Sequence, residues 1–291
     1  MSLASILFNI GASKGDRKRD KKIPFPKGVV EITDLSYGPY RRHNRMDIYY
    51  PEGADRCPII ISVHGGGYVY GDKELYKRYC MDLARRGFAV VNFNYRLAPR
   101  WKFPAPLEDL NNVVLWLSLH AKQYHADNSS IFLVGDSAGA QLASQYAAML
   151  TNPDYMALFG LTRPINRISI KAVGLNCGLY DMKTIAAGER KGLHLDYLGK
   201  KLANDDPRFA VLENIGSNYP PAFIATACHD FLRDAAEPMY NFLRERNIDA
   251  QWHCYGTEEA KHVGHVFHVN ILLPEAKQCN DDAAAFFKQY L

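Results

Sequence analysis

The sequence predicts a mixed α/β fold in which a mostly parallel sheet is covered by helices on both faces. Short apolar runs rich in β-branched and aromatic residues alternate along the chain with longer segments of helical periodicity. The runs PIIISV and FAVVNF are almost continuously apolar, as expected of strands buried on both sides. Strands that alternate with helices favour parallel pairing, because each helix returns the chain to the same end of the sheet.

The predicted elements follow this alternation. Strands are expected at Met46–Tyr50, Pro58–Val63, Phe88–Phe93, Ile131–Val134, Ile170–Asn176, Ala222–Ala227 and Gln251–Cys254. Helices are expected at Glu74–Arg86, Leu107–His120, Ala138–Leu150, Ala235–Arg246 and Glu275–Leu291. No internal repeat or low-complexity linker divides the chain, so residues 1–291 are expected to form a single domain.

Two segments fall outside this alternation and are expected to form a small helical cap. The stretch from Asp181 to Gly216 is rich in Lys, Gly and Asp and lacks a strand pattern. It is either a lid or a surface excursion without function, and the lid is favoured because long excursions in compact domains are usually functional or disordered. Residues 1–30 begin with MSLASILFNIG, which lacks the basic stretch and the cleavage site of a signal peptide. We expect an amphipathic segment that packs on the body of the protein.

Composition and charge exclude several classes of function. The formal net charge is +4, well below that of a typical nucleic-acid-binding domain, so no nucleic-acid partner is expected. The basic cluster from Lys14 to Lys22 is interpreted as a solvated arm or turn, with a site for an anionic partner as the alternative. No apolar run approaches the roughly 18 residues of a membrane-spanning helix, so no membrane span is predicted.

The cysteines favour a cytoplasmic protein without a metal site. The chain has six cysteines, with no CxxC pair and no Cys/His metal-ligand spacing. Several lie in apolar runs, such as Cys228 in AFIATAC. They are therefore interpreted as buried, reduced thiols of an intracellular protein.

The motif with the strongest chemical meaning is GDSAG, from Gly135 to Gly139. It follows the strand-like run IFLV and precedes the helical run AQLASQYAAML, which is the strand–turn–helix context of a nucleophile elbow. Such a turn strains the backbone of the serine and tolerates only small neighbours. Ser137 Oγ would then stand clear at the end of the sheet, where the N-terminus of the following helix favours negative charge.

A second motif, His64-Gly65-Gly66-Gly67, directly follows the strand-like run PIIISV. Glycine-rich loops after strands also bind phosphates, but no Gly-Lys-Ser/Thr follows here, and the G-x-G-x-x-G spacing of a dinucleotide site is not completed. The loop is therefore interpreted as an oxyanion hole, in which backbone N–H groups converge on the oxygen of a tetrahedral intermediate. The N–H of Ala138, just after the serine, would complete the set.

With these motifs the sequence resembles the hormone-sensitive-lipase-like esterases of the α/β-hydrolase superfamily. The resemblance covers about residues 30 to 291 and rests on RMDIYYP, HGGGYVYG, NYRLAP followed by FPAPLEDL, GDSAG, PPAFIATACHDFLRD and HVF. It implies the α/β-hydrolase fold, and it implies that the N–H groups of Gly66 and Gly67 act as oxyanion donors together with Ala138. Arg100 stands where the family commonly has an acidic residue. This difference affects none of the expected catalytic residues.

A serine nucleophile of this fold needs an acid and a histidine later in the chain, in that order. Asp230 follows the buried run AFIATAC and so lies at the carboxyl end of a strand, where catalytic groups gather. It also aligns with the first Asp of the family's D-x-L-x-D stretch, with Phe231 in place of a common proline. Asp230 is therefore the predicted acid. The rival acids are Asp234, which is interpreted as a helix cap, and Asp181.

Three closely spaced histidines, His262, His265 and His268, are candidates for the base. The stretch HVF that begins at His265 is similar to the family's His-Gly-Phe. It lies about 35 residues after Asp230, which leaves room for one helix and one strand. His265 is therefore the predicted base, whereas His268 is expected to begin the last helix and His262 to line the loop.

In the expected mechanism, His265 accepts the Ser137 proton and later donates it to the leaving alcohol, while Asp230 orients the imidazole. Water then hydrolyses the acyl-enzyme. No metal or organic cofactor is needed, and the partner is a small-molecule ester. Tyr68 and Asp136 are weaker candidates for substrate binding: core packing explains Tyr68 equally well, and a structural role is favoured for Asp136.

The expected activity is that of a carboxylesterase for short acyl chains, and related activities stay open. The same triad serves amidases, peptidases and esterases for acetyl or feruloyl groups on plant polysaccharides, and a small-molecule receptor is a remote alternative. A lipase for long-chain fats would expose a large apolar surface, which the mean hydropathy of −0.26 and the polar insertion do not indicate. Many members of the family pair through the last strand, so the resemblance suggests a homodimer through Gln251–Cys254.

Overall fold

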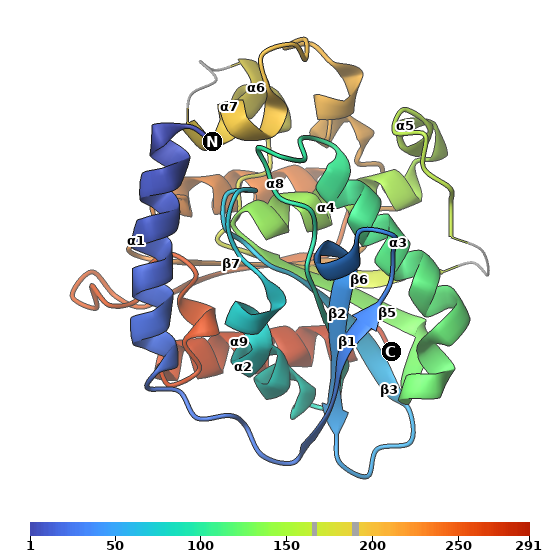
Figure 1. Cartoon of the computed structure of the whole chain (residues 1–291), viewed down its shortest axis with the longest axis vertical. Coiled ribbons are helices and arrows are strands. Elements are labelled where there is room, and N and C mark those ends of the chain that lie inside the picture. The colour runs from blue at the N-terminus through green and yellow to red at the C-terminus, as the bar shows by residue number, and fades with distance from the viewer. Residues whose placement is uncertain (165–167, 188–191) are drawn as a thin grey trace.

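The computed structural model describes residues 1–164, 168–187 and 192–291, and it confirms the predicted α/β architecture (Figure 1). The strands are β1 (Val29–Ser36), β2 (Arg45–Pro51), β3 (Cys57–Val63), β4 (Ala89–Phe93), β5 (Ala126–Asp136), β6 (Ile170–Asn176), β7 (Ala222–Ala227) and β8 (Ala250–Tyr255). They form one eight-stranded sheet with the order β1-β2-β4-β3-β5-β6-β7-β8. Strand β2 runs antiparallel to β1 and β4, and every pairing from β4 across to β8 is parallel.

The predicted helices correspond to five of the helices in the structure. The helices are α1 (Leu3–Asp20), α2 (Lys73–Ala84), α3 (Ala105–His120), α4 (Ala138–Thr151), α5 (Pro153–Ala157), α6 (Met182–Ala187), α7 (Gly192–Leu198), α8 (Ala236–Glu245) and α9 (Pro274–Lys288). The predicted ones are α2, α3, α4, α8 and α9. In the part of the chain that the structure describes, none of the helices combines the length and the apolar character needed to cross a membrane.

Helices cover both faces of the sheet, and the side chains of β3 are buried on both of these faces. Ile59 and Ile61 belong to the core on the face covered by α3, α4 and α8. Ile60 points to the opposite face, where α2 and α9 pack. All three isoleucines are fully buried. Because side chains alternate along a strand, burial on both sides favours apolar residues at successive positions such as these.

The edge strand β1 is not among the predicted strands. It pairs only with β2, and none of its side chains is fully buried. Its sequence, VVEITDLS, mixes charged and apolar residues because one side of the strand faces solvent. A half-exposed edge strand therefore lacks the continuous apolar pattern that marks the central strands.

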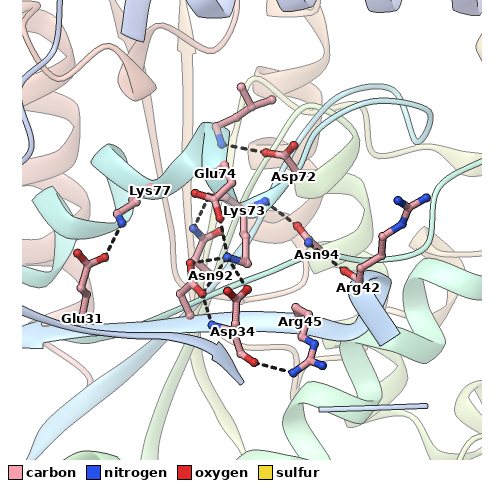
Figure 2. Close-up of polar contacts among 12 residues, drawn as sticks. Glu31, Asp34, Arg42, Arg45, Asp72, Lys73, Glu74, Lys77, Asn92 and Asn94 are labelled. Carbon is pink, nitrogen blue, oxygen red and sulfur yellow. Dashed lines mark hydrogen bonds and ion pairs between the residues drawn. The ribbon is translucent and has the colours of Figure 1, made fainter. Parts of the chain in front are cut away.

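A buried ion cluster joins the antiparallel edge of the sheet to the start of α2 (Figure 2). Lys73 is only 4% exposed, and its Nζ lies 3.0 Å from Asp47 on β2, 2.6 Å from Glu74 and 3.2 Å from Asp34 on β1. The Asn92 amide on β4 donates a hydrogen bond of 2.7 Å to the Lys73 carbonyl. Burial by itself lowers the pKa of Lys73, but the surrounding carboxylates raise that pKa above its ordinary value. The lysine therefore stays charged and holds β1, β2, β4 and α2 together.

The start of the N-terminal helix α1 lies beside α7 of the insertion, and α1 then runs along one side of the molecule (Figure 1). The Ser2 N–H donates a hydrogen bond of 2.7 Å to Asp196 of α7. The insertion is helical as expected, with α6, α7 and two short 3-10 turns at Pro207–Phe209 and Leu212–Asn214. Its residues 188–191 lie outside the described part of the chain. The N-terminal segment packs on the body as an amphipathic helix, but with its apolar side outward.

The expectation of buried, reduced cysteines is wrong for two of the six. All six are free thiols, and Cys57, Cys80, Cys177 and Cys279 are buried. Cys228 is partly exposed and Cys254 is exposed. Cys254 lies on the edge strand β8, and Cys228 directly follows the neighbouring strand β7, so that the two sulfur atoms are 3.7 Å apart.

We predict that Lys73→Ala lowers the free energy of unfolding by about 3–5 kcal/mol, because it leaves the Asp47 carboxylate buried without its partner. Urea denaturation followed by circular dichroism measures this. The matched control is Lys77→Ala in the same helix, whose partner Glu31 is half-exposed, and it should cost at most about 1 kcal/mol. Equal losses in the two variants would show that the buried cluster has no special role.

Candidate active site

Ser137 lies on a tight turn between β5 and α4. Its backbone has a φ of 53° and a ψ of −120°, a conformation that residues other than glycine rarely adopt. A Cβ at Gly135 would lie 2.2 Å from the Gly139 carbonyl oxygen, and a Cβ at Gly139 would lie 2.0 Å from that of Val63. The turn therefore requires glycine at both positions, and it holds Ser137 at the carboxyl end of the sheet.

The glycine loop after β3 lies beside this turn. Gly66 and Gly67 have φ values of 109° and 57°, and a Cβ on Gly66 would lie 2.1 Å from the Tyr70 carbonyl oxygen. Among the described residues, the N–H groups of Gly66, Gly67 and Ala138 have no hydrogen-bond acceptor. Gly67 and Ala138 border the same hollow as Ser137. Unsatisfied backbone donors next to a serine are the arrangement that an oxyanion hole requires.

His64 holds the glycine loop in place. Its side chain is fully buried, and its Nδ1–H donates a hydrogen bond of 2.8 Å to the Gly65 carbonyl. The ring stacks on Tyr95 with 4.0 Å between centroids, and the Tyr95 hydroxyl donates a hydrogen bond of 2.8 Å to the His64 carbonyl. Burial lowers the pKa of His64 to about 4, so the imidazole is neutral at physiological pH.

The loops after β7 and β8 bring Asp230 and His265 into contact. Their preceding residues, His229 and Gly264, form an isolated parallel β-bridge. His265 Nδ1 lies 2.7 Å from Asp230 Oδ1, within hydrogen-bond distance. The next residue, Val266, has a left-handed φ of 59° where the family commonly has glycine. The bridge and this turn set the direction in which the imidazole points.

The Asp230 carboxylate is buried and accepts several hydrogen bonds. The Thr226 hydroxyl donates to Oδ2 at 3.0 Å, and the Leu232 N–H donates to Oδ1 at 2.9 Å. Burial by itself raises the pKa of Asp230, but the hydrogen bonds from His265 and Leu232 outweigh it and hold that pKa below its ordinary value. The carboxylate is therefore ionised at neutral pH and can orient an imidazole.

Cys177, which the sequence analysis does not single out as a site residue, lies beside this pair. It is the first residue after β6, is buried and has a φ of 49°. Its thiol forms a hydrogen bond with Asp230 that helps to lower the pKa of the carboxyl group. The ligand-type atoms of Cys177, Asp230 and His265 lie within 4.8 Å of one another, close enough to hold a metal ion. The available sequence signal was its position at the carboxyl end of a central strand.

Ser137 and His265 border two adjacent hollows that share Phe8 of α1. Within the described residues the Ser137 hydroxyl forms no hydrogen bond with His265, and in empty active sites such bonds are often long. The hollow at Ser137 has a volume of about 220 Å³ and is lined by Phe8, Gly67, Tyr68, Ser137, Ala138, Leu179, Leu193, His194, Phe231 and Leu232. The hollow at His265 has a volume of about 410 Å³ and includes the charged or polar side chains of Asp16, Arg19, Asp136, Lys261 and His262.

The rival acids have other roles. Asp181 Oδ1 accepts hydrogen bonds from the N–H groups of Lys183 and Thr184 at the start of α6. The interpretation of Asp234 as a helix cap is wrong. Asp234 lies inside a 3-10 turn, Arg233–Ala235. The N-cap residue of α8 is therefore Ala235, whose side chain forms no capping hydrogen bond.

The two rival histidines lie in positions different from that of His265. His268 was expected to begin the last helix, and this is wrong because α9 begins at Pro274. His268 instead lies in a 3-10 turn, Phe267–Val269, buried against Tyr79. Burial lowers the pKa of His268 to about 3. His262 is exposed and borders the hollow at His265.

Tyr68 and Asp136, the weaker candidates, both contact the protein interior. Tyr68 stacks on Tyr197 with 3.8 Å between ring centroids, and it also borders the hollow at Ser137. Asp136 is buried and accepts a hydrogen bond of 2.7 Å from the Tyr76 hydroxyl. Burial raises the pKa of Asp136 to about 7, which distinguishes it from Asp230. It also lies against the glycine loop, where a Cβ at Gly65 would lie 2.4 Å from Asp136 Oδ2, and it borders the hollow at His265.

Two aromatic residues at the site carried no clear signal in the sequence. Phe231 is 75% exposed, and its ring lies 4.2 Å from the His265 ring between centroids. Phe8 reaches the site from the N-terminal helix α1 and borders both hollows. Only the packing of α1 against α7 and the loop after β3 brings Phe8 near Ser137, more than a hundred residues away in sequence.

Residues 60–269 match the model of a family described as alpha/beta hydrolase fold, which is most of the chain. The esterase LipI of Mycobacterium tuberculosis is 29% identical over 231 residues, covering 75% of this chain and 70% of that protein. An acetyl esterase of Salmonella schwarzengrund is 28% identical over 256 residues, covering 82% of this chain and 74% of that protein.

Solved structures show the same fold. A hyperthermophilic esterase from the archaeon Pyrobaculum calidifontis superposes with a TM-score of 0.77 at 27% identity, covering 99% of this chain and 91% of that chain. Esterase B from Lactobacillus rhamnosis superposes with a TM-score of 0.87 at 24% identity, covering 97% of this chain and 92% of that chain.

The chain belongs to the alpha/beta hydrolase fold family, and the resemblance to its hormone-sensitive-lipase-like branch is confirmed. It is a carboxylic ester hydrolase of the serine carboxylesterase type. The comparisons do not favour the amidase, polysaccharide esterase or receptor alternatives.

We predict that Asp136→Asn changes the pH dependence of stability. The Asp136 carboxyl has an ordinary pKa of 3.8 when unfolded and a pKa of about 7 when folded. The wild type should therefore lose stability relative to the variant as the pH rises through this window, by up to about 4 kcal/mol.

Urea denaturation at about pH 4 and about pH 8 measures this difference. The control is Leu119→Ala at an exposed position on α3, which removes no titratable group and should change stability equally at both pH values. A constant difference between Asp136→Asn and wild type would contradict the prediction.

Proposed function

We propose that Ser137 is the nucleophile, His265 the general base and acid, and Asp230 the residue that orients His265. Ser137 attacks the ester carbonyl, and His265 takes its proton and passes it to the leaving alcohol. The N–H groups of Gly66, Gly67 and Ala138 bind the oxyanion, and water activated by His265 then hydrolyses the acyl-enzyme. The observation that carries this proposal is the contact of 2.7 Å between His265 Nδ1 and the ionised Asp230 carboxylate.

The hollow at Ser137 supports a short acyl chain. It is bordered mainly by apolar side chains and has a volume of about 220 Å³. An apolar protein cavity of roughly 150 Å³ holds one benzene molecule, so this hollow has room for an acyl group of modest length. Among the relatives, the Salmonella protein is named an acetyl esterase. We therefore propose short-acyl esters as substrates.

The larger hollow is proposed to receive the alcohol part of the ester. His265 borders it, and His265 must reach the leaving oxygen in order to protonate it. Asp16 and Arg19 of α1 border the same hollow and pair with each other at 2.8 Å. A hollow with this lining suits an alcohol that carries further hydrogen-bonding groups.

Residues 1–30 and the insertion 181–216 are proposed to form one cap over a single domain. The hydrogen bond from Ser2 to Asp196 joins the two segments. Phe8 from the first segment and Leu193 from the second border the hollow at Ser137. The cap therefore contributes walls to the site that the sheet alone does not supply.

A cytoplasmic location and a homodimer are proposed as well. The six free thiols support a reducing compartment. Strand β8, which contains Gln251–Cys254, is an edge strand that pairs only with β7 among the described strands, so its other edge is available to a second copy.

Hydrolysis of p-nitrophenyl esters of increasing chain length tests the proposed triad. Wild type should prefer short chains, Ser137→Ala should abolish turnover, and Asp230→Asn should lower kcat by about 10³- to 10⁴-fold. The matched control is Asp234→Asn, which should keep wild-type turnover. Full turnover in Asp230→Asn would exclude Asp230 as the acid.

The acyl assignment predicts a shift in chain-length preference. Leu193→Ala enlarges the hollow at Ser137 and should move the preferred acyl chain to longer esters, with the greatest change in KM. Leu119→Ala, at an exposed position on α3, is the control and should leave the profile unchanged. An unchanged preference in Leu193→Ala would place the acyl chain elsewhere.

A further inference from the structure

Helix α1 exposes its apolar side chains to solvent. Leu3 is 72% exposed, Leu7 is 60% exposed and Ile10 is 61% exposed. Ile6, 42% exposed, lies between them in sequence. With 3.6 residues per turn, the spacing of these four places them on one side of the helix. This is the largest group of exposed large aliphatic side chains on any one element of the described chain.

The side of α1 that faces the protein is mainly polar. Ser5 is fully buried, and the Asn9 amide donates a hydrogen bond of 3.4 Å to the Val69 carbonyl. Asp16 accepts a hydrogen bond of 2.9 Å from the Tyr70 hydroxyl. A surface helix normally buries its apolar side and exposes its polar side. Helix α1 does the reverse, so its attachment to the body leaves the aliphatic side available to another surface.

The second half of the same outward side is cationic. Lys14, Arg17, Lys18 and Lys21 are exposed, and their spacing continues the line of Leu3, Ile6, Leu7 and Ile10 along the helix. None of these four cations has an ion-pair partner among the described residues. The acidic residues of α1, Asp16 and Asp20, pair instead with Arg19 on the inward side.

We propose that this outward side of α1 binds an anionic lipid surface. Leu3, Ile6, Leu7 and Ile10 would enter the boundary between headgroups and acyl chains. The cations from Lys14 to Lys21 would pair with lipid phosphates and carboxylates. An apolar side next to a cluster of lysine and arginine is the composition by which a helix lies on a membrane without crossing it.

The charge pattern favours lipid over a second copy of the chain as the occupant. A parallel pairing of two α1 helices would place their cationic halves against each other. A full antiparallel pairing would place the aliphatic half of each helix against the cationic half of the other. Neither arrangement buries the aliphatic side chains without opposing or desolvating unpaired cations. An anionic surface satisfies both halves at once.

The proposed binding of α1 to lipid is independent of the proposed catalytic mechanism, because the outward residues of α1 do not border either hollow. It differs from the expectation drawn from mean hydropathy, which indicated no extended apolar surface. That average fails here because it cannot show which side of a helix faces outward.

Co-sedimentation of the full-length protein with vesicles tests the proposal. One set of vesicles contains phosphatidylcholine alone, and the other contains about a third phosphatidylserine. We expect binding to the anionic vesicles that weakens with added salt. The triple variant Leu3→Gln, Leu7→Gln, Ile10→Gln and the double variant Lys14→Glu, Lys18→Glu should each reduce the partition coefficient by about tenfold or more.

Matched substitutions on the far side of the molecule, Leu119→Gln with Lys122→Glu, control for hydrophobicity and charge and should bind like wild type. All variants should retain the wild-type circular dichroism spectrum and the wild-type hydrolysis of a short soluble ester. The proposal is overturned if wild type does not bind anionic vesicles, or if the variants of α1 bind as well as wild type. It is also overturned if sedimentation velocity shows a dimer that the triple variant dissociates, because α1 would then be an interface between copies.

Discussion

The close crossing of β5, α4 and β3 at the turn around Ser137 is the constraint on which the rest of the site depends. A Cβ at Gly139 would lie 2.0 Å from the Val63 carbonyl oxygen, and one at Gly135 would lie 2.2 Å from the Gly139 carbonyl oxygen. These contacts leave no room for any other residue, and they force Ser137 into a positive φ. The same contact with the end of β3 places the glycine loop beside the serine. Nucleophile and backbone donors are therefore positioned by one local packing requirement.

Two buried carboxylates near this turn show how environment assigns different roles to the same chemical group. Asp230 receives hydrogen bonds from Thr226, Leu232 and His265, which hold its pKa below the ordinary value despite burial. Asp136 has the Tyr76 hydroxyl as its main donor, and burial raises its pKa to about 7. The first remains charged at neutral pH and is suited to orient an imidazole. The second supports the glycine loop, where a fixed negative charge is not needed.

Helix α1 connects the site with the outside of the molecule. Phe8, on its inward side, borders both hollows, while Asp16 and Arg19 add charge to the larger one. Its outward side carries the aliphatic and cationic residues proposed to meet lipid. A substrate ester partitioned into a lipid surface would thus be close to a helix that forms part of the pocket wall. The N-terminal segment would then have two roles on opposite sides of one helix. Its outward side would bring the enzyme to the lipid surface, and its inward side would contact the substrate.

The sequence by itself determined the central parallel strands, the five covering helices and the family, because these depend on local periodicity and on motifs such as GDSAG and HGGG. It also singled out Asp230, which follows the buried strand run AFIATAC, and His265, which begins the HVF stretch that is similar to the family's motif. Only the tertiary structure decided the positions of Phe8 and Cys177, the outward orientation of α1 and the edge strand β1. Each of these depends on which surfaces meet across long stretches of chain, and hydrophobic periodicity within a segment carries no information about its distant neighbours.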